Sequence, residues 1–194
     1  MRIAAATLVA GALGGLASLA ASGAPAETSP PKSVLDVGDS LSVGTAPFLK
    51  ARLRGYRVDR IYDTGLHAYD AAAIVARART TLPSVLVVSA GTNDDPRIVS
   101  TFARAISGIV EVAGGRRCVV WPTIVRPPAV GATYERFNRA LRRAADRHPN
   151  LVLVDWVGMV RRHPEWVSDD GVHVSPAGYR ARAAAIAAAI RARC

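Results

Sequence analysis

The sequence has few cysteines, few aromatic residues and fewer acidic than basic side chains. Its 194 residues include two cysteines, and phenylalanine, tryptophan and tyrosine together make up 6%. Neither cysteine stands at metal-ligand spacing from a second cysteine or a histidine, which excludes a zinc-finger module and a disulfide-rich miniprotein. We therefore expect neither a metal nor another cofactor.

Negative charge is scarce, because 25 lysines and arginines outnumber 15 aspartates and glutamates and give a formal net charge of +10. The arginines are scattered over helix-like segments without interleaved aromatic residues, and no nucleic-acid-binding motif is present. This distribution favours a solvated basic surface and no nucleic-acid partner. It leaves open a weak preference for anionic polymers outside the cell.

Long apolar runs are confined to the N-terminus. After one arginine the chain is rich in small apolar residues, and Ala24 and Ala26 form the small-x-small pattern of a signal peptidase site. A retained membrane anchor is the alternative, but an alanine- and glycine-rich stretch lacks the large apolar residues that a stable span prefers. The pattern predicts a signal peptide over 1–26, a linker over 27–32 and one domain over 33–194. We expect a secreted monomer without stable membrane insertion after cleavage.

Export would permit a disulfide between Cys118 and Cys194. Closing a loop of that length stabilises a fold by roughly 4 kcal/mol in the chain-entropy model. Against pairing, Cys118 lies in an expected buried strand and Cys194 is the final residue, where chains often fray. The sequence leaves the pairing open.

Apolar runs alternate with longer helical patterns along the rest of the chain. Three runs, "SVLVVS", "CVVW" and "LVLVDW", are nearly continuous in β-branched or large apolar residues, as in strands covered on both faces. Strands are expected at 33–37, 57–62, 84–89, 117–124 and 151–155. Helices are expected at 42–54, 69–81, 97–113, 133–148 and 176–193.

A strand–helix alternation repeated five times predicts the α/β class. The expected architecture is a three-layer α/β/α sandwich around a five-stranded, flavodoxin-like parallel sheet. Ligands of such sheets bind at the carboxyl ends of the strands. The residues that follow each strand are therefore the candidates for a functional site.

The stretch "DVGDSLSVG" at 36–44 places Ser40 between the first strand and the first helix. A serine at such a turn is often only a helix N-cap. Its amide also lies at a helix N-terminus, where free N–H groups favour a developing oxyanion. Gly38 and Asp39 are expected to shape this turn and have no expected role on the substrate.

A base for the serine is available in "DGVH". Asp170 and His173 are three residues apart, so the carboxylate can fix one imidazole nitrogen while the other takes the serine proton. Asp169 lacks this spacing and is the less favoured partner. The pattern predicts a Ser40–His173–Asp170 triad.

Further residues after the strands are candidates for binding the oxyanion. Asn93 in "GTNDD" can offer a side-chain amide, and Gly65 can offer its backbone amide together with that of Ser40. His67 is a candidate for lining the site.

These motifs, in this order, make the chain resemble the SGNH/GDSL hydrolase superfamily over nearly all of the region after the leader. "GDSL" at 38–41 resembles the nucleophile block, "GTND" at 91–94 the asparagine block and "DGVH" at 170–173 the final block. The glycine block departs from the family, because "YDTGLHAYD" has no asparagine just before Gly65. His67 in that neighbourhood and Leu66 as the aligned position are the alternatives, and the second oxyanion donor stays open.

The resemblance implies the SGNH hydrolase fold and a secreted carboxylic ester hydrolase that works through an acyl-serine intermediate. The expected substrates are short acyl esters, above all acetyl esters, on carbohydrate or small lipids, because the chain has no long lid insertion. The stretch from "VRPP" to "DGVH" also resembles the extracytoplasmic SGNH domains attached to membrane acyltransferases, which modify cell-envelope sugars. Transfer to a sugar hydroxyl and a non-catalytic binding module on the same fold are the alternatives.

Overall fold

The computed structural model describes residues 32–194. The expected signal peptide and nearly all of the expected linker lie outside the described residues. Lys32, the last residue assigned to the linker, is the first residue of strand β1. No helix within the described range is both long and apolar enough to cross a bilayer.

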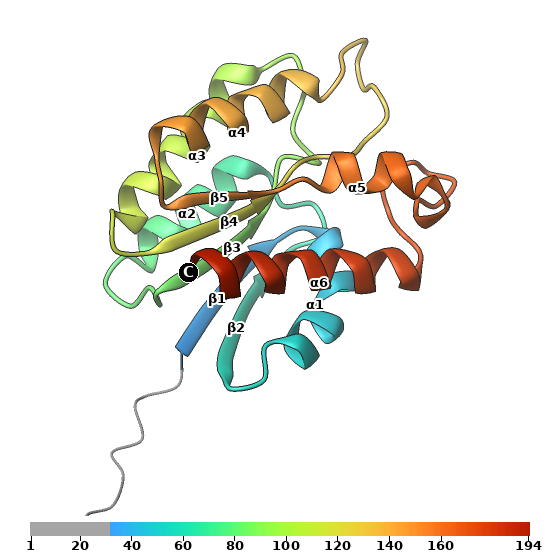
Figure 1. Ribbon diagram of the computed structural model, residues 1–194. Coiled ribbons are helices and arrows are strands. Elements are labelled where there is room, and N and C mark those ends of the chain that lie inside the picture. Colours follow the sequence, from blue (N-terminus) through green and yellow to red (C-terminus); the bar gives the residue numbers. More distant parts are fainter. Residues whose placement is uncertain (1–31) are drawn as a thin grey trace, which may run out of the picture. The chain divides into compact units, whose positions relative to one another are not determined.

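Strands and helices alternate along the described chain (Figure 1). The strands are β1 (Lys32–Gly38), β2 (Tyr56–Tyr62), β3 (Val85–Ser89), β4 (Cys118–Pro122) and β5 (Leu151–Val154). The helices are α1 (Ser40–Arg52), α2 (Ala68–Arg77), α3 (Val99–Ala113), α4 (Glu135–Arg147), α5 (Trp156–Arg162), the 3-10 helix η1 (Pro164–Trp166) and α6 (Pro176–Arg193). Every expected element is present, with ends shifted by a few residues at most.

The five strands form one parallel sheet in the order β2-β1-β3-β4-β5. This confirms the expected fold class. From β1 the chain adds β2 on one side and then β3 on the other. The carboxyl ends of β1 and β3 therefore flank the point where the winding direction reverses, which is where ligands bind in such sheets.

Alternate residues of the strands pack on opposite faces of the sheet. On β3, Leu86 and Val88 pack with α2, α3 and α4, whereas Val85 and Val87 pack with α1 and α6. Figure 1 shows these two helical layers on either side of the sheet. Since both faces are covered, the strands read as unbroken apolar runs.

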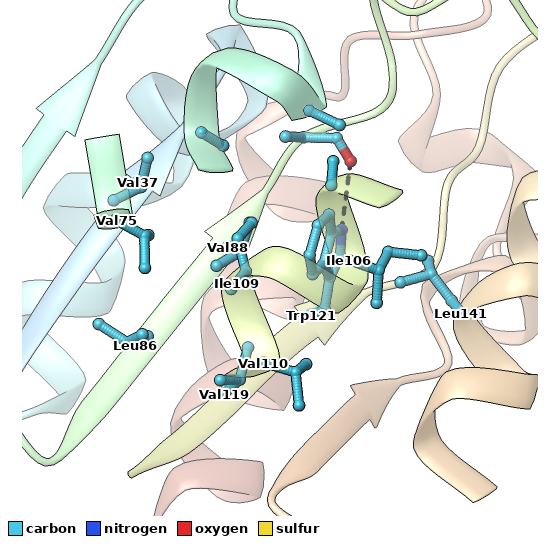
Figure 2. Packing of buried hydrophobic residues seen from close by; sticks show 14 of the residues in the cluster. Val37, Val75, Leu86, Val88, Ile106, Ile109, Val110, Val119, Trp121 and Leu141 are labelled. Atoms are coloured by element: carbon cyan, nitrogen blue, oxygen red, sulfur yellow. Dashed lines mark hydrogen bonds between the residues drawn. The ribbon is translucent and has the colours of Figure 1, made fainter. Parts of the chain in front are cut away.

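The tryptophan of β4 connects this core to the site. Trp121 is fully buried in the cluster beneath α3, and its indole N–H donates to the Ala90 carbonyl at 3.2 Å (Figure 2). The bond fixes the chain just beyond β3, three residues before Asn93.

Helices α5 and η1 are not among the expected elements. Asp155 follows β5 directly and caps α5 by accepting from the Gly158 amide at 3.0 Å. A seven-residue helix is too short to give a clear periodic signal. Trp156 stacks on Trp166 with 5.9 Å between ring centroids. This contact holds the segment that leads to His173 against α5.

The pairing of the cysteines, which the sequence left open, is settled in the structure. Cys118 at the start of β4 forms a disulfide with Cys194, which follows α6. The bond ties the last helix to the sheet.

Candidate active site

The turn between β1 and α1 presents Ser40. A Cβ at Gly38 would collide with the Ser42 side chain, so this close approach requires glycine. Asp39 is fully buried and is the N-cap of α1, where its carboxylate accepts from the Leu41 amide at 3.0 Å. Because Asp39 supplies the cap, the Ser40 hydroxyl is available for other contacts.

Folding brings Ser40 against a histidine 133 positions further along the chain. Ser40 Oγ lies 2.9 Å from His173 Nε2, and His173 Nδ1 lies 2.5 Å from Asp170 Oδ2. The bond from His173, followed by the backbone N–H groups of Val172 and His173, lowers the pKa of Asp170 to about 2. An ionised Asp170 keeps the proton on Nδ1, which leaves Nε2 able to accept a proton from Ser40.

The turn that carries Asp170 and His173 is fixed on two sides. Val167 and Val174 form an antiparallel bridge that closes the turn at its base. Gly171 has φ +69° and packs on Pro127, where a Cβ would collide with the proline ring. The imidazole is therefore held in place by the fold around it.

Asn93 lies opposite, on the loop that follows β3. A cavity of about 550 Å³ is lined by Ser40, His173 and Asn93, together with other side chains. Asn93 Nδ2 donates to the carbonyls of Thr64 and Leu66, at 3.3 and 3.2 Å. Asn93 thus lines the cavity, and its side-chain amide joins the loops that follow β3 and β2.

The Asn93 loop depends on a glycine and on a buried carboxylate. Gly91 has φ +108°, and a Cβ there would collide with the side chains of Phe102 and Ile124. Asp94 accepts from the Ala68 amide at 2.9 Å, and burial raises its pKa. These contacts fix the loop against α2 and α3.

The backbone amide of Ser40 is positioned to receive negative charge. It opens α1 and donates to no acceptor within residues 32–194. A free N–H at a helix N-terminus favours an anion, both by hydrogen bonding and by the helix dipole.

Gly65 and His67 line cavities other than that of Ser40. The Gly65 amide donates to Asp63 Oδ1 at 3.0 Å, and Gly65 lines a neighbouring cavity on the β2–α2 side. His67 sits at the start of α2, stacks on Tyr69 with 5.2 Å between ring centroids, and lines another cavity beside Asp94. Of this segment, Thr64 is the residue that reaches the cavity of Ser40.

Three residues that the sequence analysis did not select also line the cavity of Ser40, namely Thr64, Arg126 and Val172. Arg126 follows β4, so its position after a strand was the signal that could have singled it out. A cavity of about 610 Å³ surrounds the Cys118–Cys194 disulfide, but neither Ser40 nor His173 lines it. We therefore place the candidate site in the slightly smaller cavity, which Ser40 and His173 line.

A buried arginine lies beneath the turn of Ser40, on the side of α6. Arg182 of α6 is 2% exposed and donates from Nη2 to Ser89 Oγ at 2.7 Å, close to the buried Asp36 and Asp39. Burial raises the pKa of Asp36 to about 6, although the Tyr62 hydroxyl donates to its carboxylate at 2.6 Å. The sequence analysis expects the scattered arginines on a solvated basic surface, and this is wrong for Arg182, which is buried with the charges of these two aspartates nearby.

The fold is of the α/β class, and at one edge of its sheet a serine, a histidine and an aspartate are in contact. A family model for GDSL-like lipases and acylhydrolases matches residues 33–181, and the chain belongs to this family. The chain is also 24% identical over 173 residues to a putative peptidoglycan O-acetyltransferase, YrhL, of Bacillus subtilis. That match covers 86% of this chain but 25% of the relative, so the chain spans about a quarter of the relative's length.

Solved structures share the fold at low sequence identity. The C-terminal catalytic domain of peptidoglycan O-acetyltransferase A from Streptococcus pneumoniae superposes with a TM-score of 0.70 at 20% identity, over 84% of this chain and 94% of that one. A family 3 carbohydrate esterase from Clostridium thermocellum superposes with a TM-score of 0.60 at 17% identity, over 79% and 92%. The SGNH hydrolase fold expected from the motifs is therefore confirmed.

Proposed function

We propose that the protein is a secreted serine esterase that removes short acyl groups, above all acetyl, from carbohydrate or small-lipid alcohols. The observation that carries the proposal is the unbroken contact chain from Ser40 Oγ through His173 to Asp170, at 2.9 and 2.5 Å. Ser40 Oγ attacks the ester carbonyl while His173 Nε2 takes its proton. His173 then returns the proton to the leaving alcohol, and water releases the acid from the acyl-serine by the same steps in reverse.

The oxyanion formed by this attack needs donors. We assign the Ser40 amide, which is free within the described residues, and the Asn93 side chain. The two bonds that Asn93 makes to loop carbonyls, at 3.2 and 3.3 Å, are long, so one amide proton can turn to an oxyanion while the other keeps the loop. Gly65 can join only if its amide leaves Asp63.

Two further observations support the substrate class and the location. The longest connection between described elements, 123–134, is too short to form a large lid, which favours small acyl groups. Solved proteins named for peptidoglycan O-acetylation and for carbohydrate ester cleavage share this fold. An envelope or plant carbohydrate is reached outside the cytoplasm, in agreement with the signal peptide that the sequence predicts.

Acyl transfer is the second candidate, and the peptidoglycan O-acetyltransferases among the relatives favour it. The same acyl-serine would then pass its acyl group to a sugar hydroxyl in place of water. Product analysis with an acetyl donor, with and without glycan acceptors, separates the two. An acetylated acceptor that forms faster than free acetate would establish transfer.

The proposal is tested with nitrophenyl esters of increasing acyl length and with acetylated glycans, using wild type and Ser40→Ala. We expect activity that falls as the acyl chain lengthens and is lost in Ser40→Ala. A serine-reactive phosphonate should label wild type and leave the variant unlabelled. Wild type that is neither labelled nor active would instead indicate a binding module.

A further inference from the structure

Arg126 is held at the rim of the catalytic cavity by the loop that follows β4. Ile124, two residues earlier, is fixed by Asn138 of α4: its amide donates to Asn138 Oδ1 at 2.7 Å and its carbonyl accepts from Nδ2 at 2.9 Å. On the other side, Pro127 packs against Gly171 in the turn of His173. The arginine is therefore placed between the Asn93 loop and the His173 turn.

The guanidinium group is itself oriented. Arg126 Nη1 donates to the Thr92 carbonyl, and the guanidinium lies 5.8 Å from the centroid of the Tyr134 ring. Tyr134 is buried and donates its hydroxyl to the Asp94 carbonyl at 3.0 Å, so the ring is a fixed support. Nε and Nη2 make no hydrogen bond within residues 32–194.

The positive charge of Arg126 has no counter-ion in the described part of the chain. No carboxylate of residues 32–194 lies within 4.0 Å of it, whereas Arg97 and Arg57 pair with Asp95 and Asp59. The carboxylate in the same cavity, Asp170, is occupied by His173 and by two backbone amides. A half-buried, oriented cation thus faces the cavity with free N–H donors.

We propose that Arg126 selects esters whose alcohol part carries an anionic group, either a carboxylate or a phosphate. The inference rests on the proposed function, because a short acyl group is itself uncharged and leaves the alcohol as the place for the anion. A planar guanidinium with two free donors binds carboxylate or phosphate in a two-point contact. The substrate class is then the acylated acidic sugar or sugar phosphate, and neutral glycans are poorer substrates.

The test compares esters that differ in one charge. The substrates are 4-acetoxybenzoate, the neutral 4-acetoxybenzamide of nearly the same shape, and 4-acetoxyphenyl phosphate, with release of the phenol as the readout. Wild type should favour the anionic esters in kcat/KM by about tenfold or more, chiefly through KM, as expected for a charged hydrogen bond. The better of the two anionic esters shows whether Arg126 prefers a carboxylate or a phosphate on the alcohol part.

Arg126→Gln should bring the ratio of anionic to neutral kcat/KM close to one, and Arg126→Lys should restore part of it. Any general loss of activity, caused by release of the Thr92 carbonyl, lowers both rates and cancels in the ratio. Arg143→Gln, which removes the same charge from an exposed position on α4, should keep the wild-type ratio. This control separates local binding from attraction by the overall charge of +10.

Each result decides between the two proposals. Wild type that hydrolyses all three esters equally, or an Arg126→Gln variant that keeps the wild-type ratio, would overturn the inference and leave the esterase intact. A ratio that falls as much in Arg143→Gln would also overturn it, because net charge would then be the cause. Wild type that hydrolyses none of the three and resists the phosphonate would remove the esterase proposal and, with it, this inference.

Discussion

Asn93→Ala tests the assigned oxyanion site most directly. The substitution removes one donor to the oxyanion, and the loss of such a donor typically costs about 10²- to 10³-fold in turnover, or about 3–4 kcal/mol in the barrier. It also removes the contacts with the Thr64 and Leu66 carbonyls, each worth about 0.5–1.5 kcal/mol of stability. We therefore expect kcat for a nitrophenyl acetate to fall at least about a hundredfold while the protein stays folded.

The chain offers a matched control in Asn150. Its Nδ2 likewise donates to two backbone carbonyls, of Gly114 and Arg117, at 2.9 and 3.1 Å, but these lie at the other cavity, beside the disulfide. Asn150→Ala should lower the free energy of unfolding by a similar amount and leave kcat near wild type. Equal turnover in wild type and Asn93→Ala, or equal losses of kcat in both variants, would refute the assignment of Asn93 to the oxyanion.

Three further predictions concern charge and covalent structure. Because the pKa of Asp170 is about 2, this carboxyl group stays ionised above about pH 4. The acid limb of a plot of log kcat/KM against pH should therefore have a slope of one, and a slope of two would contradict this. The folded-state pKa of Asp36, about 6, exceeds its ordinary value of 3.8, so its ionisation destabilises the fold as pH rises through that interval. Asp36→Asn should therefore gain up to about 3 kcal/mol relative to wild type between about pH 4 and pH 7 in urea unfolding, and a constant difference would count against the buried carboxyl. Replacing Cys118 and Cys194 by serine opens a loop with a sequence separation of 76. The free energy of unfolding should fall by about 4–5 kcal/mol, with little change in the acylation of Ser40. A loss below about 1 kcal/mol would show that the bond does not restrain the unfolded chain.

Local patterns in the sequence were sufficient for the fold class and for the three main catalytic candidates. Unbroken apolar runs such as "SVLVVS" require cover on both faces, and together with the fivefold strand–helix alternation they imply a parallel sheet between helical layers. The spacing of Asp170 and His173 predicts their contact because three residues within one turn can meet without help from the rest of the fold. The position of Ser40 after a strand predicts its exposure at the edge of the sheet where ligands bind.

Contacts between distant segments decided the rest, because no local pattern encodes which carbonyl or carboxylate a side chain will meet. The Gly65 amide is taken by Asp63, and the cap of α1 is Asp39. In the sequence Arg182 cannot be told from the surface arginines, but the packing of α6 buries it beside two aspartates. Arg126 is positioned by a loop that α4 fixes on one side and the turn of His173 on the other. Only the tertiary structure could therefore show, in the cavity of Ser40, a cation without a counter-ion among residues 32–194.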